Sequence, residues 1–227
     1  MEQAAGRRDL NTPARIAGFA WLVVIIAGIS AEFFLRMPLI VQGDAAATAA
    51  NIMEAEGRFR LSIAADTVML LFDVTATVAL YLLFRQTDRL LALTAAAFRL
   101  IMGAVLAANL LTLGSVPLVL QGADPAAATT VQLLLDIHGT GYDIGLVFFG
   151  LHCFLLGILI MKSAYLPRLL GALLMAASLG YLLDSFSHLL LPQGTPFLAM
   201  TASALIAVAL LAELSISFWL MVKGVKS

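Results

Sequence analysis

Charged and titratable side chains interrupt the long apolar runs of this sequence, and they are the residues with which it could do chemistry. Burying an Asp or Arg at the centre of a membrane helix costs about 2.5–3.5 kcal/mol on insertion scales, so such residues usually face a bundle interior or a cavity. The set includes every histidine of the chain: Glu32, Asp66, Asp73, Arg99, Asp136, His138, Asp143, His152, Asp184, His188 and Glu213. It predicts a polar interior.

A metal site is the first chemistry that these residue types indicate. Imidazole and carboxylate groups are common ligands of zinc and related ions. His138, Asp184 and His188 are the candidate ligands, and Asp184 and His188 share one helical stripe. Asp143 and Asp66 are candidates for a further ligand or a general base. A zinc-like ion would lower the pKa of a bound water to about 7 and so supply a nucleophile.

Haem b is the second interpretation. His138 and His152 lie fourteen residues apart on one helical face with Gly141 and Gly145 between them, a spacing that resembles a helix of the two-haem cytochrome b proteins. Haem needs a second axial ligand at the same depth. His188 could partner His138, but no histidine remains for His152. Separate histidines satisfied by hydrogen bonds are therefore the simpler interpretation.

Two further interpretations stay open. Chains of Asp, Glu and His can relay protons or carry a solute through a bundle. Alternatively, polar side chains hold helices together, at about 0.6 kcal/mol each on average. The buried Arg99 needs a counter-ion, for which Asp73 is the first candidate and Glu213 the second. The residues decide neither whether the protein is an enzyme nor which small ligand it binds.

The composition indicates that membrane helices position these groups. Hydrophobic residues make up 62% of the chain and charged residues 12%, whereas soluble domains carry about a quarter charged residues. Lipid is the natural solvent for so apolar a chain. A net charge of −1 leaves no basic surface for nucleic acid. The partner is thus the bilayer, and a homo-oligomer is left open.

Six apolar runs are long enough to span a bilayer, for which a helix needs about 20 residues. They predict an all-α, polytopic membrane protein with one transmembrane domain over residues 1–227. The runs are 16–35, 61–84, 90–113, 131–161, 169–191 and 197–222. The fourth is polar on two sides, which predicts a place at the bundle centre for it. Its glycines would let neighbouring helices approach closely.

Basic residues predict the orientation. Nine lie on the side of the chain ends: Arg7, Arg8, Arg15, Arg85, Arg89, Lys162, Arg168, Lys223 and Lys226. The other side has only Arg36, Arg58 and Arg60, and these are diluted by acids. By the positive-inside rule both termini are cytoplasmic. Six spans with this topology place His138, Asp184, His188 and Asp66 in the outer half, and Asp73, Arg99, His152 and Glu213 deeper.

The segment between the first two spans predicts a short helix on the outer membrane surface. Residues 45–56 are rich in alanine, and Asp44 before them suits an N-cap. Gly57 suits a C-cap. The role of this helix is left open.

Several stretches together resemble a known family. They include VQGDAAATAANI from Val41, FRLSIAADTVMLLFDV from Phe59, FRLIMGAVLAANLL from Phe98, DIHGTGYDIGLVFFGLHCFLLG from Asp136 and LPRLLGALLMAASLGYLLDSF from Leu166. The chain resembles, over about Arg15 to Pro192, the bacterial membrane family catalogued as domain of unknown function 4386. The resemblance implies an integral protein of a bacterial inner membrane. It implies no activity and no catalytic residue.

Overall fold

The described part of the chain consists of helices joined by short turns and loops. The computed structural model describes residues 10–122, 125–191 and 196–225. Arg7, Arg8 and Lys226, which entered the prediction of orientation, lie outside it. The α-helices in this part are α1 (Asn11–Ile29), α2 (Ala45–Glu54), α3 (Glu56–Phe84), α4 (Arg89–Gln121), α5 (Ala127–Ser163), α6 (Arg168–Leu190) and α7 (Pro196–Val222). A π-helical turn, Ser30–Arg36, and a 3-10 turn, Met37–Leu39, extend α1.

Six of these elements are long and apolar enough to cross a membrane. The predicted polytopic helical architecture, with a short helix between the first two spans, is therefore confirmed. Some spans are longer than the apolar runs predicted from the sequence: the first covers Asn11–Leu39 and the fourth Ala127–Ser163. Many large hydrophobic side chains are exposed on the outside of the bundle, among them Leu71, Leu90 and Leu111. In a membrane protein such side chains contact acyl chains.

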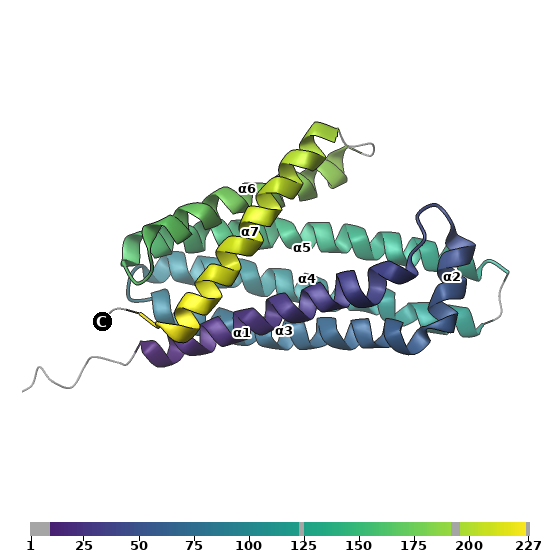
Figure 1. Ribbon diagram of the computed structural model, residues 1–227, viewed down its shortest axis with the longest axis horizontal. Coiled ribbons are helices and arrows are strands. Elements are labelled where there is room, and N and C mark those ends of the chain that lie inside the picture. The colour runs from purple at the N-terminus through teal and green to yellow at the C-terminus, as the bar shows by residue number, and fades with distance from the viewer. Residues whose placement is uncertain (1–9, 123–124, 192–195, 226–227) are drawn as a thin grey trace, which may run out of the picture.

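The six spans pack in a closed ring. Each contacts the next in the order α1, α3, α4, α5, α6 and α7, and α7 returns to α1. In Figure 1, α1, α3, α4 and α5 run along the long axis, whereas α6 and α7 are inclined to them. The predicted central position of the fourth span is confirmed only in part: α5 is the most buried of the six spans, but its main neighbours among them are α4 and α6 alone. Its second polar side stays at the surface, where Asp136 and Thr140 are exposed.

The two ends of the bundle differ. α2 lies across one end, called here the α2 end, and α1 begins and α7 ends at the other, the terminal end (Figure 1). At the terminal end the Asn11 side chain accepts a hydrogen bond from Val225 N at 3.0 Å. At the α2 end, Asp44 caps α2 by accepting from Ala47 N at 2.8 Å, as predicted. Gly57 does not end α2, since it lies in the first turn of α3.

Glycines bring α5 close to its neighbours. A Cβ on Gly157 would lie 2.7 Å from the carbonyl oxygen of Gly171 on α6. One on Gly145 would lie 2.9 Å from Leu106 on α4. These distances leave no room for a methyl group, so the predicted role of the α5 glycines is confirmed at both positions.

Candidate functional site

The deepest polar groups centre on Arg99, which is fully buried on α4. Its Nε donates to Asp73 Oδ1 on α3 at 2.8 Å, and its Nη2 lies 2.7 Å from the same oxygen. Its Nη1 lies 3.1 Å from Nε2 of His152 on α5. A guanidinium only donates, so His152 Nε2 accepts, and its Nδ1 donates to the Ala95 carbonyl at 2.9 Å. His152 is therefore neutral, with both ring nitrogens engaged.

The remaining spans complete this group around the guanidinium. The rings of Trp21 and Phe149 lie 4.8 and 5.5 Å from its central carbon. Trp21 Nε1 donates to Glu213 Oε2 at 3.1 Å, and Tyr181 Oη donates to Glu213 Oε1 at 2.7 Å. Glu213 thus bonds to α1 and α6, while Asp73 is the direct partner of Arg99. Every span contributes at least one side chain to this central network (Trp21, Asp73, Arg99, His152, Tyr181 and Glu213).

A groove of about 540 Å³ between α3 and α4 reaches the central network. Its walls are mainly apolar, and Asp73 and Arg99 are among the residues that line it. Arg99 is fully buried and Asp73 nearly so, so the groove leaves almost nothing of either polar group accessible.

A second polar cluster lies nearer the α2 end. Arg36, at the end of the π-helical turn, donates from Nε to Glu32 Oε2 at 3.0 Å and from Nη1 to Asp66 Oδ2 at 2.7 Å. The Glu32 side chain is 41% exposed, whereas that of Asp66 is 5% exposed. Ser62 lies 3.5 Å from Arg36 Nη1. π-helical turns are rare and are frequent at functional sites.

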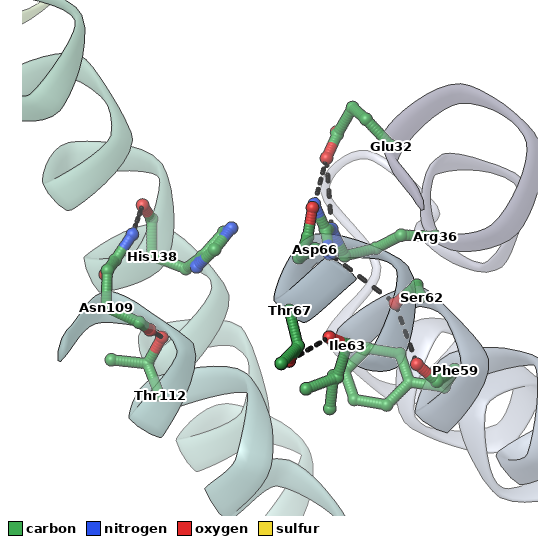
Figure 2. A network of polar contacts seen from close by, with 10 residues as sticks. All are labelled: Glu32, Arg36, Phe59, Ser62, Ile63, Asp66, Thr67, Asn109, Thr112 and His138. Carbon is green, nitrogen blue, oxygen red and sulfur yellow. Dashed lines mark hydrogen bonds and ion pairs between the residues drawn. The ribbon is translucent and has the colours of Figure 1, made fainter. Parts of the chain in front are cut away.

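His138 on α5 faces this second cluster (Figure 2). Its main-chain carbonyl accepts a hydrogen bond from Asn109 Nδ2 at 2.7 Å, which fixes α5 to α4. The residue is 8% exposed, and neither ring nitrogen has a hydrogen-bond partner among the described residues. The Tyr142 ring, one turn further on, lies 6.1 Å away.

A third group joins α5 to the last turns of α6. One ligand atom from each of Asp143, Asp184 and His188 lies within 4.8 Å of the other two. His188 Nδ1 lies 3.2 Å from Asp143 Oδ1. The His188 side chain is 56% exposed and that of Asp143 is 18% exposed. The group is therefore open to its surroundings on one side.

The candidate residues thus fall into three places. The expected ligands Asp184 and His188 lie together with Asp143, while His138 does not belong to that group. His138 and Asp143 are five residues apart, which turns their side chains about 140° from each other on a helix. Asp66 lies in the Arg36 cluster, and His152 is held by Arg99 and Ala95.

Comparison with known proteins places the chain in a family. The family model described as "Domain of unknown function (DUF4386)" matches residues 16–224. The chain belongs to this family. The match includes all six spans, so the last span, which the sequence resemblance left out, is part of the family domain. Membership assigns no activity to this DUF4386 protein.

A curated relative from Archaeoglobus fulgidus, named only as an uncharacterized protein, is similar to this family member. The two are 30% identical over 167 residues, which cover 73% of this chain and 85% of the relative. No solved structure matches the chain.

The sequence of this DUF4386 protein did not predict the roles of Arg36 and Trp21 in these clusters. Arg36 was assigned to the outer loop, although it is 2% exposed. Its spacing of four residues from Glu32 is a signal that could have revealed the pair. Trp21 carries no charge, so nothing in the sequence singled it out as a partner of Glu213.

Proposed function

We propose that this is a multi-pass protein of a bacterial cytoplasmic membrane, with both termini in the cytoplasm and α2 outside. The even number of spans and the contact between Asn11 and Val225 support this proposal, because both agree with two chain ends on one side. Arg15, Arg85, Arg89, Lys162 and Arg168 all lie near the terminal end or in its connections. The positive-inside rule then makes that side cytoplasmic.

We further propose that Asp143, Asp184 and His188 bind a divalent zinc-like ion. The observation that carries this is the approach of one ligand atom from each residue to within 4.8 Å of the others. Two carboxylates and one imidazole form a ligand set that suits zinc. The two carboxylates would also carry two negative charges, which offset the two positive charges of the ion in an apolar bundle.

Such a site fits a catalytic role better than a purely structural one. Structural zinc sites have four protein ligands, whereas catalytic sites have three and leave one position for water. The described residues offer three, and His188 is exposed. The ion would lower the pKa of that water and supply a nucleophile for hydrolysis. The substrate would reach it from the side of the bundle where α5 and α6 meet.

Metal analysis of purified protein tests this proposal. The detergent-purified full chain is loaded with zinc, freed of excess by gel filtration and analysed by mass spectrometry for bound metal. We expect about one zinc per chain, lost in His188→Ala and in Asp184→Asn. Asp136→Asn is the control, because Asp136 is an exposed acid on α5, the helix of Asp143, and is not one of the three ligands. Stoichiometric zinc retained in a His188→Ala/Asp184→Asn double variant would overturn the assignment.

The central network favours a second, compatible role in holding the bundle together. Its side chains come from all six spans and hydrogen-bond or stack on one another. A haem interpretation finds no comparable support, because both nitrogens of His152 are already bonded.

A further inference from the structure

The groove between α3 and α4 opens sideways, toward the acyl chains of the membrane. Leu71, Val74 and Leu100 line it and are 66%, 51% and 44% exposed. On α4 the small residues Gly103 and Ala104 leave room for it. Its volume of about 540 Å³ lies within the range of about 300–1,000 Å³ that is usual for small-molecule sites. The groove is therefore large enough for a ligand that enters from the lipid.

One carboxylate oxygen beside this groove has no hydrogen bond. Both contacts of Asp73 with Arg99 go to Oδ1, which lies 2.8 Å from Nε and 2.7 Å from Nη2. Oδ2 accepts no hydrogen bond from the described residues, and it lies next to Gly103, where a Cβ would be 3.9 Å away. Oδ2 also keeps some accessible surface, whereas Nη2 of Arg99 has almost none. The 4% of the Asp73 side chain that is exposed thus gives a ligand in the groove one contact point.

This oxygen lies deep in the membrane. Asp73 is eleven residues from Phe84, the last residue of α3 at the terminal end, which corresponds to a rise of about 16 Å. That distance is about half of a bilayer core of about 30 Å, so phospholipid headgroups stay far from it. The core holds no water that could take their place. Buried polar atoms almost always have a partner, so the free oxygen needs a donor that is itself soluble in lipid.

We propose that the groove binds a neutral long-chain alcohol, whose hydroxyl donates to Asp73 Oδ2 and whose chain lies along the apolar walls. The charge of Asp73 is already balanced by Arg99, so the oxygen requires a hydrogen-bond donor that carries no charge. The groove runs on α4 from Leu100 to Leu110, about 15 Å along the helix, which suits one extended chain. The site is separate from the three metal ligands on α5 and α6.

A matched pair of photoreactive probes tests this recognition. Hexadecanol with a mid-chain diazirine, or its methyl ether, is added to nanodiscs of phosphatidylglycerol that hold the full-length protein, and the labelled residues are mapped by mass spectrometry. We expect the alcohol to label α3 and α4 saturably and to be displaced by plain hexadecanol. The ether has no O–H donor and should label at least about tenfold more weakly. Equal labelling by both probes, or labelling that does not saturate, would overturn the proposal, since the groove would then hold the acyl chains of bulk lipid.

A substitution in the wall of the groove locates the chain of the alcohol. Ala104→Leu fills the groove from α4 and should abolish the saturable labelling. Ala108→Leu is the matched control, because Ala108 is also exposed on α4 but does not line the groove. Unaltered labelling of folded Ala104→Leu protein would refute the site. Zinc binding should survive both substitutions, which separates this proposal from the metal site.

Substitutions at the carboxylate locate the hydroxyl. Asp73→Asn keeps one oxygen for Arg99 and offers the groove an N–H donor in place of the free acceptor, so the alcohol and the ether should label alike. If this variant does not fold, Gly103→Val decides, because its methyl groups would cover Oδ2 and remove the same preference. A preference for the alcohol that persists in the folded variant would show that Asp73 does not bind the hydroxyl, and so would contradict the proposal.

Discussion

Arg99 Nη1 lies 3.1 Å from His152 Nε2 in the centre of the bundle. The contact fixes the proton of His152 on Nδ1, where it serves the carbonyl of Ala95. It also leaves Nε of Arg99 for Asp73. The guanidinium of Arg99 thereby joins α3, α4 and α5. Because Arg99 is fully buried, water cannot replace these hydrogen-bond partners.

The Asp73–Arg99 pair should behave as one unit in unfolding experiments. Removing one partner leaves a buried charge alone, so Arg99→Met or Asp73→Leu should each lower the free energy of unfolding by about 3–5 kcal/mol. The double variant should lose clearly less than the sum, because no lone charge remains. Arg60→Met is the control: its exposed pair with Glu56 should matter by no more than about 1 kcal/mol. Additive losses would show that the two side chains act independently.

Alanine substitutions at two glycines of α5 should change the stability of the protein differently. A Cβ at Gly157 would meet Met175 and lie 2.7 Å from the Gly171 carbonyl oxygen, so Gly157→Ala should destabilise the protein by about 1–3 kcal/mol. A Cβ at Gly139 meets nothing within 4 Å. Gly139→Ala should therefore be neutral or stabilising by up to about 1 kcal/mol, as in other helices. Thermal unfolding midpoints in one detergent check both; a destabilised Gly139→Ala protein would contradict the packing described.

The Asp88–Lys162 contact between spans should make stability depend on acid pH. Lys162 Nζ lies 2.9 Å from Asp88 Oδ2, and this hydrogen bond, with that from Leu91 N, holds the pKa of Asp88 below its ordinary 3.8. The folded state thus binds the proton less readily than the unfolded one, so the contribution is complete above pH 3.8 and is lost as pH falls through the lowered value. Lys162→Met should narrow the difference in unfolding midpoint between about pH 6 and about pH 3. An unchanged pH profile would count against the contact.

Cysteine labelling should place α2 outside the cell. The native Cys153 is buried and gives no background. A membrane-impermeant maleimide added to intact cells should label Ala50→Cys on α2, where residue 50 is exposed. Gln86→Cys, in the connection between α3 and α4, should react only after permeabilisation. The reverse pattern would invert the orientation proposed from the basic residues.

The sequence by itself determined that this protein lies in a lipid bilayer and that its spans are helices. Six apolar runs of sufficient length admit only spanning helices, since backbone groups in lipid must be satisfied within one segment. The sequence also predicted the N-cap of α2. The Asp44 side chain accepts from the free amide of Ala47, three residues further along the chain. Spacing along one helix also grouped Asp184 with His188, four residues apart.

Only the tertiary structure decided which helix faces which. Periodicity gives the side of a helix on which a residue lies, but the rotation of each helix and its neighbours in the ring depend on packing. His138 therefore faces Arg36 and Asp66 rather than His188, and Glu213 bonds to Trp21 and Tyr181. Close glycine contacts such as Gly157 with Gly171 set those rotations, because a shift of one residue would bring a side chain into the backbone of the neighbouring helix.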